Sequence, residues 1–258
     1  MNLEQKLNYH YKQFDKSQLE PDPLQFPHLF EDENDIEVMA FIASVFAYGS
    51  VTQIINSLSK IVRKMDNNPF DFIKQFNIRQ DAAKFRGINH RFYTYTDIVR
   101  LFHLIKFSYN KYGSLYNLFL NGFNKSDESV KDGIMNFSCF FLTAYLKKFG
   151  SISNGIKFMF PLPEKGSACK RMNLFLRWMV RSDELDFGFW NDLPKSKLII
   201  PVDTHIAKIC RQLKLTERKN ISWNMAQEIT DRLKKFDPLD PVKYDFALCH
   251  IGMRKMKF

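Results

Sequence analysis

The amino-acid sequence predicts an all-α protein of helices joined by short connections. Apolar residues recur at helical spacing along several segments, and no segment sustains the two-residue alternation of a half-buried β-strand. The 258 residues include ten glycines and ten prolines, which is few for the many turns of a β-sandwich. A chain of this length fits one large domain or two small lobes, and we expect a unit of two helical lobes over residues 1–258.

Five helices are predicted in the N-terminal part of the chain. Prolines at positions 21, 23 and 27 end the first of them, and an acidic run over 31–37 leads into the second. Gly49 ends the second helix, and apolar residues three and four positions apart mark the third as amphipathic. We predict these helices over residues 2–18, 36–49, 51–65, 96–112 and 128–149.

A helix–hairpin–helix is predicted over about 151–182. Residues 151–159 form its first helix, which the prolines at 161 and 163 end. Gly166 supplies a permissive turn, and the second helix runs over about 167–181. Backbone N–H groups at the start of such a helix are free to bind an anion, so this segment is a candidate phosphate-binding element.

A second informative segment covers about 198–214. Three apolar residues lead to Pro201, and Asp203 then stands where the N-cap of a helix over 204–213 is expected. The exposed N–H groups and the macrodipole of that helix would hold the carboxylate in its ionised form. Most capping aspartates are purely structural, so the position alone leaves both a structural and a catalytic role open.

The charge balance favours a polyanionic partner. The net charge is +10, and residues 1–40 hold nine acidic and three basic side chains, so the remainder carries +16. A basic body of this kind fits a nucleic acid, whereas the plainer alternative is a lysine-rich solvated surface. The chain has no apolar run of membrane-spanning length and no signal-peptide core, so we expect a soluble cytoplasmic protein without a membrane partner.

The predicted hairpin supplies the candidate DNA contacts. The backbone N–H groups of Gly166, Ser167 and Ala168 would point out of the second helix toward a phosphate. The side chains of Lys165 and Arg171 add positive charge beside them. Lys170 lies in the same stretch, and as a surface residue it would be one more phosphate contact.

Taken together, the two segments resemble the helix-hairpin-helix DNA glycosylase superfamily. The resemblance rests on a lysine at the start of the second hairpin helix, Lys170, and on the run PVDTH, which contains Asp203 and opens another helix. This superfamily includes endonuclease III and the 8-oxoguanine DNA glycosylases. Lys170 and Asp203 are 33 residues apart, which resembles the archaeal 8-oxoguanine glycosylase branch.

Longer segments extend the resemblance and also show departures from it. The runs GSACKRMNLFLRWMVR, PVDTHIAKI and DPVKYDFALCHIG are similar to a bacterial family related to the archaeal branch. The superfamily hairpin has Gly-x-Gly, whereas this chain has Gly166, Ser167 and Ala168 in that place. The cysteine quartet of endonuclease III is absent, as it is in the 8-oxoguanine branches.

The resemblance implies a base-excision repair enzyme, a bifunctional DNA glycosylase and AP lyase that removes a damaged purine from duplex DNA. It makes 8-oxoguanine the favoured lesion, Lys170 the nucleophile and Asp203 the essential carboxylate. Breaking the N-glycosidic bond develops positive charge on the sugar, which a fixed carboxylate stabilises. Neutral Lys170 would attack C1′, the resulting Schiff base would allow β-elimination, and the base must first leave the stack.

Three further residues are candidates for contacts with DNA or with the extruded base. His205, two positions after Asp203, would contact a phosphate or pack on the hairpin. Gln53 lies in the region where glycosylases of this class place pocket residues. Tyr48 is a candidate stacking residue, with packing in the core as the alternative.

Two residues near the C-terminus complete the candidate base pocket. Asp245 and Phe246 lie in a predicted C-terminal helix, and the archaeal branch contributes pocket residues from its C-terminal region. Asp245 has an alternative role, because it is also placed to cap its helix or to pair with Lys243 or Arg254.

No metal or organic cofactor is expected. The cysteines at positions 139, 169, 210 and 249 are widely spaced without a CxxC pair, which argues against a structural zinc site or an iron–sulfur cluster. We expect them to be reduced, buried thiols. The resemblance leaves room only for a structural monovalent cation at the hairpin, and it implies a monomer associated with the bacterial nucleoid.

Two other functions remain open on the sequence. The first is a non-catalytic DNA- or RNA-binding module that keeps the hairpin but lacks a base pocket. The second is a glycosylase-like enzyme that acts on a nucleoside or on a modified nucleic acid other than damaged duplex DNA. The meeting of Lys170 and Asp203 at one site is the geometric requirement of the glycosylase hypothesis.

Overall fold

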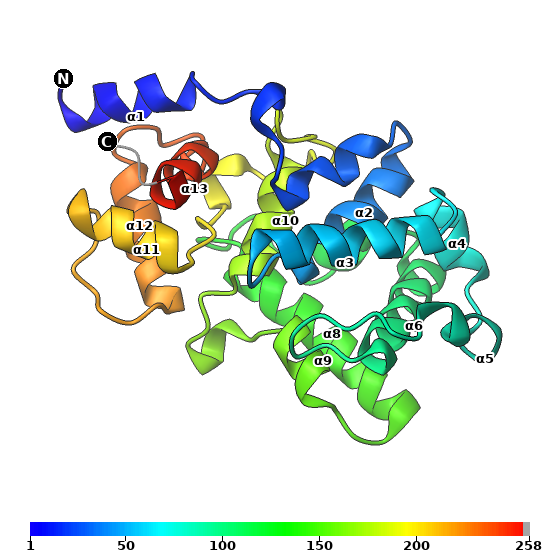
Figure 1. The fold of residues 1–258 in the computed structure, drawn as a ribbon. Coiled ribbons are helices and arrows are strands. Elements are labelled where there is room, and N and C mark those ends of the chain that lie inside the picture. Colours follow the sequence, from blue (N-terminus) through cyan, green and yellow to red (C-terminus); the bar gives the residue numbers. More distant parts are fainter. Residues whose placement is uncertain (255–258) are drawn as a thin grey trace. The chain divides into compact units, whose positions relative to one another are not determined.

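The chain is helical throughout the part that the structure describes. The computed structural model describes residues 1–254, in which helices are joined by turns and loops without any β-strand, as the sequence predicted (Figure 1). These residues form two compact units. Unit 1 contains residues 1–19, 125–131 and 162–254, and unit 2 contains residues 20–124 and 132–161.

Unit 2 is built around α6 (Tyr95–Tyr112), the long helix that contacts most of its neighbours. It packs against α4, α5, α7 and α9, while α2 packs against α3 and α4. The other helices of this unit are α2 (Glu33–Phe46), α3 (Val51–Lys64), α4 (Pro69–Gln75), α5 (Ile78–Asp81), α7 (Leu115–Leu120), α8 (Lys131–Phe149) and α9 (Asn154–Met159).

A cluster of phenylalanine rings fills the core of unit 2. Phe141 stacks on Phe160, with ring centroids 4.6 Å apart, and on Phe41, with centroids 5.7 Å apart. Phe137 meets the edge of both Phe41 and Phe141. Burial of rings of this size contributes much of the stability of such a core, and their offset and edge-on contacts add to it.

Unit 1 has α13 (Asp245–Arg254) packed against α1 and α11, as Figure 1 shows. Its other helices are α1 (Leu3–Tyr11), α10 (Lys170–Val180), α11 (Thr204–Gln212) and α12 (Trp223–Leu233). All residues of α10 after Lys170 are buried, so this helix lies inside the protein instead of showing one polar face to solvent.

Three of the predicted helices match closely and others differ in their ends. Helices α3, α6 and α11 agree with the predicted ranges to within one residue at each end. The second helix, predicted over 36–49, begins and ends three residues earlier, so Gly49 does not end it. The first helix was predicted over 2–18 but ends at Tyr11. Asp15 then accepts a hydrogen bond from the N–H of Ser17 and starts a separate 3₁₀ turn, because a short acidic side chain competes for backbone donors outside a helix.

Four helices were not predicted at all, namely α4, α5, α7 and α12. The first three have four to seven residues, too few to show helical periodicity. In α7 the helix start depends on a side chain far away in the sequence, because buried Glu37 of α2 accepts hydrogen bonds from the backbone N–H groups of Leu115 and Tyr116.

A glycine lets the first predicted arm of the hairpin pack closely in unit 2. A Cβ atom at Gly155 of α9 would lie 2.5 Å from Oδ2 of Asp97 in α6. That carboxylate is buried, and it accepts hydrogen bonds from Thr94 and, at 2.5 Å, from the hydroxyl of Ser153. Because these partners hold Asp97 in place, any side chain at position 155 would force the helix away.

We therefore expect Gly155→Ala to lower the free energy of unfolding by about 1–3 kcal/mol, the usual cost of overpacking. Urea denaturation of the full chain measures the change. The control is Asn154→Ala at the exposed preceding position, which should change stability by less than about 0.5 kcal/mol. Equal stability of the two variants would show that α9 adjusts without cost.

Candidate active site

The turn before α10 differs from the predicted hairpin in where the helix begins. A 3₁₀ turn, Pro163–Lys165, ends at Gly166, whose φ of +80° is left-handed, and the N–H of Gly166 donates to the carbonyl of Pro163 at 2.9 Å. Cys169 also has a left-handed backbone, with φ of +47°, so the helix begins at Lys170 and not at about residue 167. Two left-handed residues in this segment interrupt the helical backbone.

The predicted phosphate donors are therefore rearranged. Gly166 uses its N–H inside the turn, and its carbonyl accepts from the first residue of α12 at 3.2 Å. Ser167 and Ala168 precede the helix, and Ala168 is buried. Arg171 is only 6% exposed, so it offers little surface to a phosphate, whereas Lys165 is exposed, and the DNA-binding roles of both residues stay predictions.

Asp203 is the N-cap of α11, as predicted. Its Oδ1 accepts hydrogen bonds from the N–H groups of His205 at 2.9 Å and of Ile206 at 3.0 Å. Its Oδ2 lies 3.3 Å from Nζ of Lys170, the first residue of α10. One carboxylate thus caps a helix with one oxygen and pairs with the lysine through the other, although the two residues are 33 positions apart.

The ion pair of Lys170 and Asp203 is accessible to solvent, and its surroundings keep Asp203 ionised. The side chains of Lys170 and Asp203 are 28% and 23% exposed. Burial acts to raise the pKa of Asp203, but the charge of Lys170 and the N–H of Ile206 outweigh it and hold that pKa below its usual value. The carboxylate is therefore ionised at neutral pH, and it lies where the positive ends of α10 and α11 meet.

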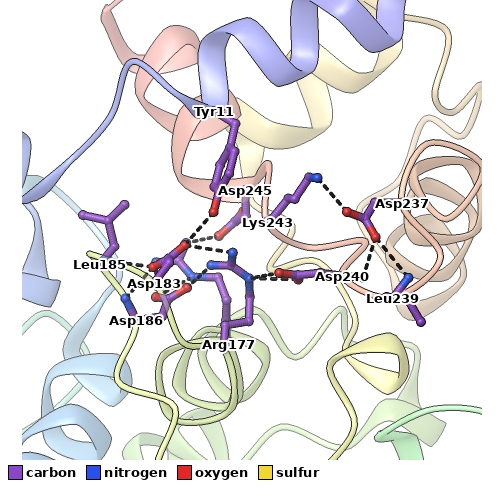
Figure 2. Close-up of polar contacts among 11 residues, drawn as sticks. Tyr11, Arg177, Asp183, Leu185, Asp186, Asp237, Leu239, Asp240, Lys243 and Asp245 are labelled. Atoms are coloured by element: carbon purple, nitrogen blue, oxygen red, sulfur yellow. Dashed lines mark hydrogen bonds and ion pairs between the residues drawn. The ribbon is translucent and has the colours of Figure 1, made fainter.

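Buried ion pairs join α10, the helix that begins at Lys170, to α13, and Figure 2 shows the residues that form them. Nη1 of Arg177, on α10, lies 2.5 Å from Oδ2 of Asp245, the first residue of α13, and Nη2 lies 3.2 Å from Oδ1 of Asp186. Burial raises the pKa of Asp245 to about 6 despite Arg177, and the negative charge of Asp203 adds to the increase. Asp245 is therefore electrostatically coupled to the lysine–aspartate pair.

Arg181 extends these buried ion pairs by one helical turn. It pairs with Asp186, with Asp183 at 2.9 Å and with Asp240 at 2.9 Å. Tyr11, at the end of α1, donates to Asp183 at 3.1 Å. This network was not predicted from the sequence. The available signal was the pair Arg177 and Arg181, four positions apart in the apolar stretch that ends α10, because buried guanidinium groups require carboxylate partners.

The remaining candidates in unit 1 are placed as follows. The ring of His205 is exposed, while its backbone is close to Gly252 of α13. Phe246 is buried and stacks on His250 with ring centroids 4.1 Å apart, so it presents no exposed ring to a base. Asp245 is buried as well, and its partner is Arg177.

Lys243, one of the two alternative partners considered for Asp245, is not paired with it. Lys243 pairs with Asp237 at 2.6 Å, and the side chain of Arg254 lies outside the described residues. The alternative pair with Lys243 is therefore not formed, and the alternative pair with Arg254 stays a prediction. Asp245 pairs with Arg177 because α10 is buried. The guanidinium of Arg177 cannot be hydrated there and needs a buried carboxylate as its partner.

Tyr48 and Gln53 lie in unit 2. The hydroxyl of Tyr48 donates to the carbonyl of His90 at 2.7 Å and accepts from the N–H of Phe92 at 3.1 Å. Its ring stacks parallel to that of Phe92, with centroids 6.2 Å apart. Gln53 is exposed in the first turn of α3. The roles of these two residues in a base pocket stay predictions. The packing of the predicted hairpin helices, α9 and α10, also stays a prediction, because α9 belongs to unit 2 and α10 to unit 1.

The cysteines agree only partly with the expectation of buried thiols. Cys169 and Cys210 are buried, Cys249 is half-buried and Cys139 is exposed. Burial raises the pKa of the Cys169 thiol to about 12 and also raises that of Cys210, so both are protonated at neutral pH. Among residues 1–254 no group of three or more His, Cys, Asp or Glu side chains is arranged to hold a metal ion.

Within the same residues, no helix has the length and apolar character needed to cross a membrane.

The sequence model of a family described as "Protein of unknown function (DUF2400)" matches residues 22–254. The chain belongs to this family. The match includes both Lys170 and Asp203, and its description names no activity. No curated protein and no solved structure matches the chain. Any function for this DUF2400 member therefore has to be argued from its own residues.

We expect Arg177→Met to lower the free energy of unfolding by about 3–5 kcal/mol, because it leaves Asp245 and Asp186 buried without this partner. The loss should be larger at pH 8 than at pH 5. The folded-state pKa of Asp245 already lies above its unfolded value, and removing Arg177 raises it further, so the variant loses stability as pH rises.

Urea denaturation at the two pH values measures both effects. The control is Lys243→Met, which breaks the more exposed pair with Asp237 and should cost less than about 1 kcal/mol. A pH-independent loss in Arg177→Met would mean that Asp245 is not the group that Arg177 compensates.

Proposed function

We propose that this protein is a DNA N-glycosylase with AP lyase activity that removes a damaged purine, 8-oxoguanine being the favoured lesion. The observation that carries the proposal is the distance of 3.3 Å between Nζ of Lys170 and Oδ2 of Asp203. A nucleophilic amine and a fixed carboxylate at one solvent-accessible place are the two groups that this reaction requires. The choice of lesion rests on the resemblance to the 8-oxoguanine glycosylases alone.

In this mechanism Asp203 stabilises charge and Lys170 forms the covalent bond. Lys170 first loses a proton, and the adjacent Oδ2 of Asp203 is placed to accept it when DNA excludes water from the pair. The lone pair of Nζ then bonds to C1′ as the N-glycosidic bond breaks, and the proton held by Asp203 passes to the departing base, which restores the ionised carboxylate. The C1′–O4′ bond next opens, O4′ takes a proton from Nζ, and a protonated Schiff base forms. Loss of a C2′ proton then expels the 3′ phosphate by β-elimination.

The capping bonds make Asp203 suited to that role. Because Oδ1 is held by two backbone N–H groups, the carboxylate cannot turn away from the position beside Nζ without losing the cap of α11. A charge that is already oriented needs no reorganisation when positive charge develops on the sugar. The net charge of +10 supports an anionic polymer as the partner.

The rival is a non-catalytic nucleic-acid-binding protein. It is favoured by the same ion pair, since an ionised Asp203 beside Lys170 stabilises the ammonium form, which is not nucleophilic. The two functions differ in one observable step, the formation of a covalent intermediate with DNA.

Two variants separate the roles within the pair. Lys170→Ala should abolish the complex that borohydride traps on an 8-oxoguanine duplex, while DNA binding weakens by no more than one phosphate contact. Asp203→Asn keeps a capping side chain but loses the charge, so base release should fall by about two to four orders of magnitude while binding persists. Gel assays of trapping, base release and binding, run in parallel on one duplex, measure these effects.

Lys165→Ala is the matched control, because it removes an exposed positive charge from the same segment without touching Asp203. It should bind DNA slightly less well and be trapped as efficiently as the parent. If the parent protein binds the duplex but releases no base and is never trapped, the binding-protein function takes the place of the glycosylase.

The turn at Gly166 provides a separate test of DNA binding. Its φ is +80°, and a Cβ atom at this position would have no neighbour within 4 Å, so Gly166→Val acts through backbone strain of about 1–2 kcal/mol and not through a clash. If the turn faces DNA, this variant should weaken binding to all sequences alike, and binding by the parent should fall steeply with salt.

Gly150→Val is the matched control for that experiment. Gly150 has a φ of +81° and equally open surroundings, but it lies in unit 2, away from the turn in sequence. It should lose similar stability and keep its DNA affinity, measured by fluorescence anisotropy across a salt series. Equal affinity of the two variants would remove the turn from the proposed DNA contact.

A further inference from the structure

Unit 2 contains a cavity of about 740 Å³ between α6, α7 and α8, lined by none of the groups used in the proposed function. Every residue that lines it belongs to unit 2, whereas Lys170 and Asp203 belong to unit 1. Its volume lies within the range of about 300–1,000 Å³ that is usual for small-molecule sites.

The walls of this cavity offer aromatic faces. The rings of Phe107 on α6 and Phe140 on α8 are almost parallel, with an angle of 8° and centroids 5.8 Å apart. Tyr112 meets the edge of Phe140 with centroids 5.4 Å apart. Phe107 is 43% exposed, which is unusual for a phenylalanine and leaves one apolar surface available to a ligand.

The polar part of the cavity is positive. Lys111, Lys147, Lys148 and His103 line it, and none of the lining residues is an aspartate or a glutamate. Nζ of Lys111 lies over the ring of Phe140, 5.5 Å from its centroid. The pKa of His103 is lowered mainly by burial, and the charges of Lys148 and Lys106 lower it further.

A buried carboxylate holds two of the helices that form the cavity. Glu37 accepts a hydrogen bond from the hydroxyl of Tyr109 on α6 at 2.5 Å and from the N–H of Leu115 on α7 at 2.9 Å. Asn136 of α8 donates to the carbonyl of Gly122, just after α7, at 2.9 Å. These contacts fix the cavity before any ligand arrives, which reduces the entropy lost on binding.

We propose that this cavity binds a small organic anion that combines a flat aromatic body with one carboxylate or sulfonate group. The body would stack on the exposed face of Phe107 beside Phe140, and the anionic group would lie among the lysines. Aromatic stacking and a charge-assisted contact then act on the two ends of one molecule. This site is independent of the proposed DNA chemistry and goes beyond it.

The test uses 2-naphthoate as the probe and the full chain as the protein. Binding is followed by the displacement of 1-anilinonaphthalene-8-sulfonate, whose fluorescence rises in apolar surroundings. Naphthoate should bind at least about 10-fold more tightly than the neutral 2-naphthalenemethanol, because only the anion meets the lysines. The double variant Lys147→Gln/Lys148→Gln should lose most of that preference, and the control Lys60→Gln/Lys64→Gln, on α3, should keep it.

Cys139 locates the bound molecule. This thiol is exposed in the cavity wall, so N-ethylmaleimide should alkylate it readily. Naphthoate at saturation should block access to Cys139 and slow its alkylation at least about 5-fold. Cys249, half-buried on α13, is the internal reference whose rate should not change. Peptide mass spectrometry over a time course reports both rates.

The outcomes are distinct. Unchanged alkylation of Cys139 at saturating naphthoate, or equal affinity for the acid and the alcohol, overturns the proposal. Displacement of the dye by single-stranded oligothymidylate but not by naphthoate also overturns it, since the surface would then serve a nucleic acid. Lys170→Ala should bind naphthoate as the parent does while losing the trapped DNA complex, so the cavity and the glycosylase proposals fail independently.

Discussion

The contact between Arg177 and Asp245 is the interaction on which the geometry of unit 1 depends. It joins α10 to the first residue of α13, and α13 in turn packs against α11, whose N-cap is Asp203. Because the buried guanidinium of Arg177 needs the carboxylate of Asp245, α10 and α13 are held together. This contact in turn positions Lys170 of α10 relative to Asp203 of α11. A pair of this kind contributes modest net stability while intact, but losing either partner is costly, so it specifies the arrangement of the helices more than it strengthens the fold.

Buried carboxylates have the same structural role in both units. Glu37 anchors α7 to α6, Asp97 anchors the start of α9, and Asp245 anchors α13 to α10. In each case the buried carboxylate accepts hydrogen bonds from polar groups of a neighbouring helix or loop. Losing these bonds would leave buried polar groups without partners, so the bonds restrict where the helices can lie. Hydrophobic attraction is non-directional, and satisfied polar contacts such as these specify one arrangement of the helices.

The two oxygens of Asp203 show why a structural role and a chemical role need not exclude each other. The cap determines where the carboxylate is, and the low pKa determines that it is charged. Asp245 lies close enough to respond to that charge, because Asp203 raises the pKa of Asp245 while Lys170 lowers it.

The sequence by itself determined the helical class, the ranges of α3 and α6, and Asp203 as an N-cap. Each of these depends on residues within one or two turns of helix, where spacing and capping chemistry act locally. Only the tertiary structure decided the partner of Arg177, the burial of Arg171, the exposure of Cys139 and the start of α10 at Lys170. Those outcomes depend on which helices cover one another, and no local pattern carries that information. Asp245 and Arg177 are 68 residues apart, and they pair because two buried helices meet there.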